Sequence, residues 1–167
     1  MKMNYAEEIQ SFIEMLTDDE ALNSISKDGG VNPTFIFLLQ NENGEYGNAV
    51  IDPPKEMFDD RVKKDMFMKL IFPKIKEQII NDGNKIISIA FVCEAWKSAD
   101  ESLLEGGKLD ESNSDEILMV SVHYEGNKID FFYPIIRIAG KMTFGNKEVM
   151  QSAYDSEKSS GRFAELM

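Results

Sequence analysis

The chain has 167 residues, 43% of them hydrophobic and 10% aromatic, which suits one globular domain with a core. Thirty acidic residues against 18 basic ones give a net charge of −12, which disfavours binding to exposed nucleic acid or to an anionic membrane. A basic protein surface, or a small molecule held in a cleft, remains compatible with this charge.

The sequence also points to a compartment. The N-terminus carries acidic residues where a signal peptide would carry an apolar stretch, and no apolar run approaches the roughly 20 residues of a membrane-spanning helix. Cys93 is the only cysteine, so no internal disulfide can form. We therefore expect a cytoplasmic protein without a membrane segment.

The first half of the chain predicts a helix followed by a β-hairpin. Residues 4–17 place Ile9, Phe12, Ile13 and Leu16 at helical spacing. Residues 33–40 read as a strand that is apolar on both sides, so we expect it inside a sheet. Asn43-Gly44 predicts a tight turn before a short returning strand over residues 46–51.

A long helix is expected next. Asp52, followed by two prolines, is a suitable N-cap, and the helix would run to about Ile80. Phe58, Val62, Met66 and Leu70 mark one apolar stripe on it, and Phe72, Ile75 and Ile79 continue it. Pro73 should kink or divide the helix, because proline lacks the backbone donor.

The second half predicts three further strands. Residues 86–96 form one strand, and an acidic connection over residues 97–115 follows, long enough to be functional or mobile. Residues 116–124 and 128–138 form a hairpin around a turn at Gly126-Asn127. Residues 139–145 can add a short last strand.

These elements predict a single α+β domain over residues 1–145, with two layers and the order α-β-β-α-β-β-β. About five antiparallel strands would carry the helices on one face, an order shared with profilin-like and longin-like domains. Residues 146–167 are expected to be a tail, partly helical or mobile.

A turn at Gly126-Asn127 fixes the pairing of the second hairpin. It places Glu116 opposite Arg137, as a cross-strand ion pair at the end of the sheet or as a polar anchor at the rim of a pocket. It also places His123 opposite Asp130 beside the turn. We expect a solvated surface pair there, since no motif places a nucleophile beside it.

Glu94 and Trp96 end the strand over residues 86–96 and share one of its faces. A buried glutamate is costly unless it is paired, so Glu94 needs a partner such as Arg137 or Lys97. Trp96 would either close the edge of the core or act as a binding anchor, because tryptophan and arginine are enriched at binding hot spots.

Motifs for metal or cofactor chemistry are missing from the sequence. There is no C-x-x-C, P-loop, G-x-G-x-x-G or G-x-S-x-G motif, and one histidine with one cysteine cannot form a His/Cys zinc site. Cys93 points toward the expected core, so it should be an inert thiol. We expect no catalytic residue, no metal and no cofactor.

The segment FVCEAW, residues 91–96, resembles the SEAW segment of uncharacterised bacterial and phage-borne proteins. In those proteins an acidic or proline-rich loop follows, and then a polar cluster that Ser114-Asp115-Glu116 resembles. The likeness covers the order of elements from about Pro33 to Ile138. Cys93 stands where those proteins have serine, and no arginine accompanies Glu116. The resemblance implies a phage or mobile-element context and no assigned activity.

Three functions remain open. The first is a non-catalytic acidic protein-interaction module that binds a basic protein, with a surface formed by Glu94, Trp96, Glu116, Arg137 and the connection over residues 97–115. The second is a small-ligand-binding protein or hydrolase that uses the carboxylates of Glu94 and Glu116 in one cleft. The third is an assembly subunit with a large apolar self-interface, which would make it a homo-oligomer.

Overall fold

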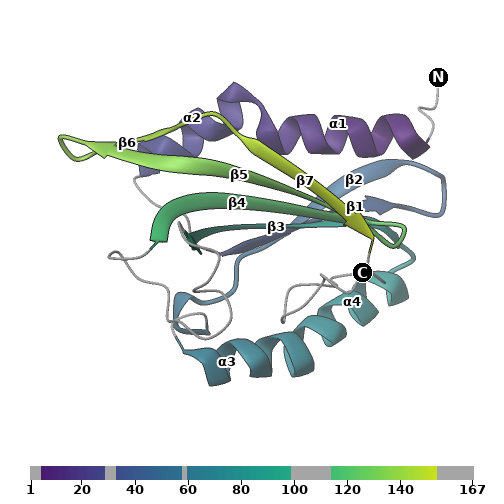
Figure 1. The fold of residues 1–167 in the computed structure, drawn as a ribbon. Helices are drawn as coiled ribbons and strands as arrows, with labels where there is room; N and C mark the ends of the chain where they lie inside the picture. Colours follow the sequence, from purple (N-terminus) through teal and green to yellow (C-terminus); the bar gives the residue numbers. More distant parts are fainter. Residues whose placement is uncertain (1–4, 29–32, 58–59, 99–113, 154–167) are drawn as a thin grey trace.

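The computed structural model describes residues 5–28, 33–57, 60–98 and 114–153 (Figure 1). The helices are α1 (Tyr5–Thr17), α2 (Asp19–Asp28), α3 (Arg61–Met66) and α4 (Phe72–Asn81), with a 3₁₀ turn at Lys55–Met57 and a π-helical turn at Phe67–Ile71. The strands are β1 (Thr34–Gln40), β2 (Tyr46–Ile51), β3 (Lys85–Ser98), β4 (Ser114–Tyr124), β5 (Asn127–Ile138), β6 (Lys141–Phe144) and β7 (Glu148–Ala153).

All seven strands join one antiparallel sheet in the order β2-β1-β3-β4-β5-β6. The strand β7 pairs with the first half of β5, and β6 pairs with its second half, so two short strands share one side of β5. The predicted α+β class and antiparallel sheet are confirmed. The sheet has more strands than the expected five, partly because the segment expected to be a tail contributes β7, while residues 154–167 lie outside the described part.

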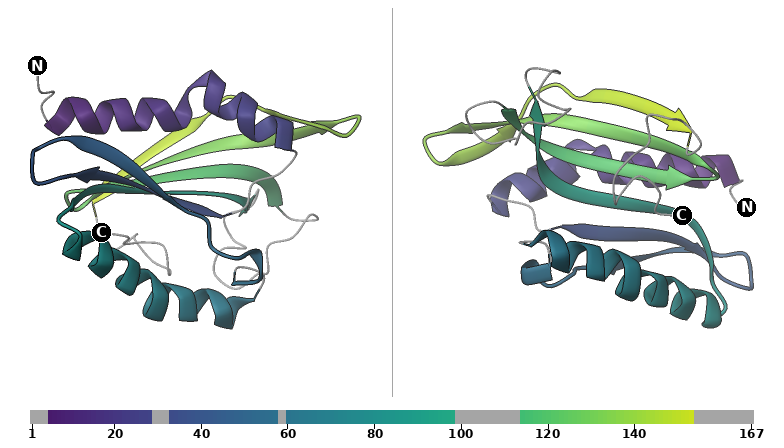
Figure 2. Two further views of the ribbon diagram at one scale, coloured as in Figure 1. Left: turned by 180° about the vertical axis from the view of Figure 1, so that it is seen from behind. Right: turned by 60° about the horizontal axis from the view of Figure 1, so that its bottom comes forward.

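The helices cover both faces of the sheet, so the expectation of helices on one face was wrong (Figures 1 and 2). Helix α1 packs its predicted apolar residues against one face, which includes Leu38 and Val92. Phe67 and Phe72 pack against the other face, beside Phe35 and Phe91. The physical reason is that β1 and β3 are apolar on both sides, and each side has to be covered.

The long predicted helix begins later than expected. Its N-cap is Asp60, whose side chain accepts hydrogen bonds from the backbone N–H groups of Val62 and Lys63. Asp52 instead accepts a hydrogen bond from the Thr34 hydroxyl at 3.0 Å. The helix is not broken at Pro73, because a π-helical turn precedes it, in which the N–H of Phe72 bonds to the carbonyl of Phe67.

The turn of the β4–β5 hairpin lies one residue earlier than predicted. Glu125 and Gly126 are its central residues, with φ of 43° and 73°, as a type I′ turn requires. Tyr124 therefore pairs with Asn127, and Ser121 pairs with Asp130. Each predicted pairing is shifted by two residues, which keeps every side chain on its predicted face but changes its neighbours.

Candidate functional site

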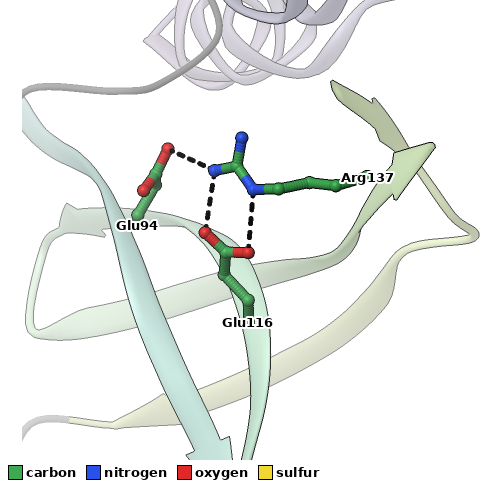
Figure 3. A network of polar contacts seen from close by, with 3 residues as sticks. All are labelled: Glu94, Glu116 and Arg137. Carbon is green, nitrogen blue, oxygen red and sulfur yellow. Dashed lines mark hydrogen bonds and ion pairs between the residues drawn. The ribbon is translucent and has the colours of Figure 1, made fainter. Parts of the chain in front are cut away.

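Glu94, Glu116 and Arg137 meet at one end of the sheet, from the three neighbouring strands β3, β4 and β5 (Figure 3). We call these three residues the carboxylate–arginine cluster. Strand alternation puts Glu94 on the same face as Val92, which packs in the core beneath α1. The cluster therefore continues the α1 face of the sheet beyond its apolar part.

One guanidinium group holds both carboxylates. Arg137 donates from Nε to Glu116 Oε2 at 3.1 Å and from Nη2 to Glu116 Oε1 at 2.8 Å, which is the bidentate geometry that arginine forms with a carboxylate. The same Nη2 lies 3.7 Å from Glu94 Oε1. The ion pair predicted between Glu116 and Arg137 is thus present, but its partners lie diagonally across the hairpin rather than directly opposite.

The contact between Arg137 and Glu116 favours the charged form of each, and the cluster is partly open to solvent. The hydrogen bond from Arg137 lowers the pKa of Glu116 below its usual value, although partial burial opposes this, and the same contact raises the pKa of Arg137. The side chain of Arg137 is 43% exposed. Two carboxylates and one guanidinium give the three residues of the cluster a formal charge of −1.

Two further parts of the predicted surface lie at least partly outside the described residues. Trp96 pairs with Glu116 in the β3–β4 ladder, but its side chain lies outside the described part of the structure. Most of the acidic connection, residues 99–113, lies outside it as well. Trp96 as a binding anchor and the connection as part of the surface therefore stay predictions.

His123 and Asp130 form a buried group with Ser121, so the prediction of a solvated pair was wrong. The exposed fractions are 0% for His123, 6% for Asp130 and 3% for Ser121. Ser121 Oγ donates to Asp130 Oδ1 at 2.5 Å and lies 3.0 Å from His123 Nε2. Lys128 Nζ lies 3.3 Å from Asp130 Oδ2. We call these three buried residues, together with the partly exposed Lys128, the buried polar group.

The order of these contacts differs from that of a catalytic triad. In a triad the histidine lies between the serine and the aspartate, whereas here Ser121 lies between the other two. Because the serine hydroxyl gives its only proton to Asp130, His123 Nε2 must donate to Ser121. Burial, and then the charge of Lys128, lower the pKa of His123 to about 3, so the imidazole is neutral. The group can satisfy buried polar atoms, but it presents no activated hydroxyl.

We did not predict from the sequence that Ser121 and Lys128 belong to the buried polar group. Ser121 and His123 stand two residues apart in a strand and so face the same side, which is a usable signal. The wrong position of the turn concealed it, because that position put Phe132, and not Asp130, opposite Ser121.

Cys93 is buried, as predicted. Desolvation raises the pKa of its thiol to about 12; Lys64 opposes this shift, and the charge of Glu94 adds to it. A thiol with such a pKa is protonated at neutral pH and a poor nucleophile. Among the residues that the structure describes, no group of three or more His, Cys, Asp and Glu side chains could hold a metal ion.

The described helices include none with the length and apolar character needed to cross a membrane. No protein-family model, curated protein or solved structure matches the chain.

Proposed function

We propose that the protein is a non-catalytic acidic module that binds a basic protein surface at the carboxylate–arginine cluster. The proposal is carried by one contact: the partly exposed guanidinium of Arg137 holds the carboxylates of Glu116 and Glu94, which come from different strands. Fixed carboxylates lose little conformational entropy when a cation approaches them, so they favour binding.

The surroundings of the cluster support a basic partner. Helices α1 and α2 cover the same face of the sheet, and residues 5–28 contain seven acidic residues and one basic residue. Glu14, Asp18, Asp19 and Glu20 are exposed there. We call the outer surface of α1 and α2 the acidic side. Long-range attraction to it would speed the encounter with a basic protein, and the cluster would then contact that protein directly.

The electrostatics speak against the alternative of a hydrolase that uses Glu94 and Glu116. A general acid needs a carboxyl group with a raised pKa, whereas Arg137 lowers the pKa of Glu116. One guanidinium also lies between the two carboxylates, at the place where a substrate would have to bind. Phage association and cytoplasmic location stay predictions from the sequence.

An affinity capture with matched variants tests the proposal. The tagged chain is incubated with lysate of the cells that naturally contain it, beside Glu94→Lys and Glu77→Lys. Both variants change the charge by the same amount, but Glu77 is exposed on α4, across the sheet from the cluster. We expect a basic protein that is retained by the wild type and by Glu77→Lys and lost by Glu94→Lys. Equal capture by all three would refute the proposed site.

A further inference from the structure

A row of apolar side chains lies on the outer surface of α3 and the π-helical turn. Val62, Met66 and Leu70 are 66%, 50% and 58% exposed. Four-residue spacing places them along one line of the helix, and we call this line the apolar ridge. Rows of this kind normally pack against another element, so three consecutive exposed members mark an unpartnered helix face.

The ridge is exposed because other residues of the same helix already fill the core. Phe67 and Phe72 are 2% and 4% exposed and pack against the sheet. The π-helical turn between them brings these two side chains, five residues apart, onto the sheet side. The predicted stripe is therefore divided: Val62, Met66 and Leu70 form a row that faces outward, whereas its predicted continuation at Phe72, Ile75 and Ile79 packs on the core. Phe58 lies outside the described residues.

The charge around the ridge is opposite to that of the rest of the chain. Residues 61–81 contain six basic and two acidic residues, whereas the remaining chain contains 12 basic and 28 acidic ones. Lys63, Lys69 and Lys74 are exposed on this helical segment. Within the described residues none of these three lysines forms an ion pair. The α3–α4 segment is thus a basic and apolar surface, on the opposite side of the sheet from the acidic side.

We propose that the apolar ridge and its flanking lysines dock an acidic amphipathic segment of a second protein. An apolar row at helical spacing fits the apolar stripe of such a segment, and Lys63 and Lys69 fit carboxylates beside that stripe. This surface lies across the sheet from the carboxylate–arginine cluster, so the protein could hold a basic and an acidic partner at the same time.

Two other occupants fit less well. If two copies met ridge to ridge, their lysines would face each other, and the acidic side of a second copy buries its apolar residues against its own sheet. An anionic membrane would attract the lysines but repel the rest of the chain, with its 28 acidic and 12 basic residues.

Photo-crosslinking of the full chain tests the proposal. A photo-reactive phenylalanine analogue replaces Met66, and a control replaces Met15, which is 42% exposed on α1. Both proteins are illuminated in the cells that naturally contain the chain, and the crosslinked peptides are sequenced. We expect a product at Met66, absent at Met15, that joins one other protein at an acidic segment with apolar residues at helical spacing.

Several results would overturn the proposal: no product at Met66, a product with a lipid, or a product within the chain or between two of its copies. A joined segment that is basic or neutral would also overturn it.

The joined segment, made as a peptide, is then titrated against purified variants. We expect Lys63→Glu/Lys69→Glu to weaken binding by about tenfold or more, which corresponds to at least about 1.4 kcal/mol. The control Lys85→Glu/Lys141→Glu makes the same charge change at exposed lysines of β3 and β6, and should change binding by less than about twofold. If both double variants lost the same amount of affinity for the peptide, binding would follow overall charge, and this would contradict the docking surface.

Discussion

Arg137 and Glu116 are joined by two hydrogen bonds, of 3.1 and 2.8 Å, that link β5 to β4 beyond the last paired residues of the ladder. The backbone ladder between these strands ends with Ile117 and Pro134. The side-chain contact therefore continues the link between the two strands beyond the backbone ladder. Glu94 of β3 lies beside the same guanidinium.

Replacement of Glu116 by glutamine should lower stability at neutral pH, and this loss should become smaller in acid. The pKa of Glu116 is lowered in the folded state, so its contribution is complete above its unfolded pKa of about 4.3 and disappears as the pH falls through the folded pKa. Urea unfolding of the wild type and Glu116→Gln at pH 7 and at pH 3 checks this. A stability difference that persists unchanged at pH 3 would contradict the ionised pair.

The imidazole of His123 should stay neutral down to strongly acidic pH. Its pKa is lowered to about 3, against about 6.5 in the unfolded chain. Protons then bind preferentially to the unfolded state, so His123 lowers stability as the pH falls below about 6.5, by at most about 1.4 kcal/mol per pH unit. An NMR titration of the His123 ring protons measures the pKa directly, and a midpoint near 6.5 would show that the ring is solvated.

The variant Ser121→Ala should destabilise the fold by about 1–3 kcal/mol. It removes the hydroxyl that Asp130 Oδ1 and His123 Nε2 share, and leaves both atoms buried without this partner. Denaturant unfolding measures the loss. The matched control is Ser24→Ala at an exposed position of α2, which should stay within about 0.5 kcal/mol of the wild type. Equal effects of the two variants would rule out the buried polar group.

The variant Glu125→Asn should stabilise the protein by up to about 1 kcal/mol. Glu125 has a φ of 43° as the first central residue of the turn, a conformation that asparagine adopts more readily than glutamate. Thermal unfolding of Glu125→Asn and Asn127→Gly separates the two positions of the turn. If Asn127→Gly stabilises and Glu125→Asn does not, the turn lies at Gly126-Asn127 instead.

Much of the fold follows from local patterns in the sequence. The α1 residues Ile9 and Phe12 are buried as predicted, because their helical spacing leaves one face for them. The strand over residues 33–40 lies inside the sheet, since it is apolar on both sides. A strand that is apolar on both sides needs helices packed on both faces of the sheet. The prediction of a two-layer domain did not take this requirement into account.

The failures of prediction have specific physical causes. Glu125-Gly126 and Gly126-Asn127 both offer a glycine for a tight turn, so the sequence alone leaves two positions for the turn, and the buried neighbours of His123 depend on the choice. The predicted apolar stripe divides at the π-helical turn, which shifts the helical period, so that Val62, Met66 and Leu70 face outward whereas Phe72 faces the sheet. In contrast, the predicted contact between Glu116 and Arg137 is present despite the wrong turn, because a two-residue shift keeps both side chains on the same face. Glu94 lies beside Arg137, which was one of its two predicted partners.

The most direct test of the account is a calorimetric titration of the captured basic protein against wild type, Glu94→Lys and Glu77→Lys at matched salt. The account predicts that Glu94→Lys weakens binding by about tenfold or more, and that Glu77→Lys, with the same change in net charge, weakens it by less than about twofold. Equal weakening by the two variants would show that binding follows overall charge and not the carboxylate–arginine cluster, and would contradict the proposed site.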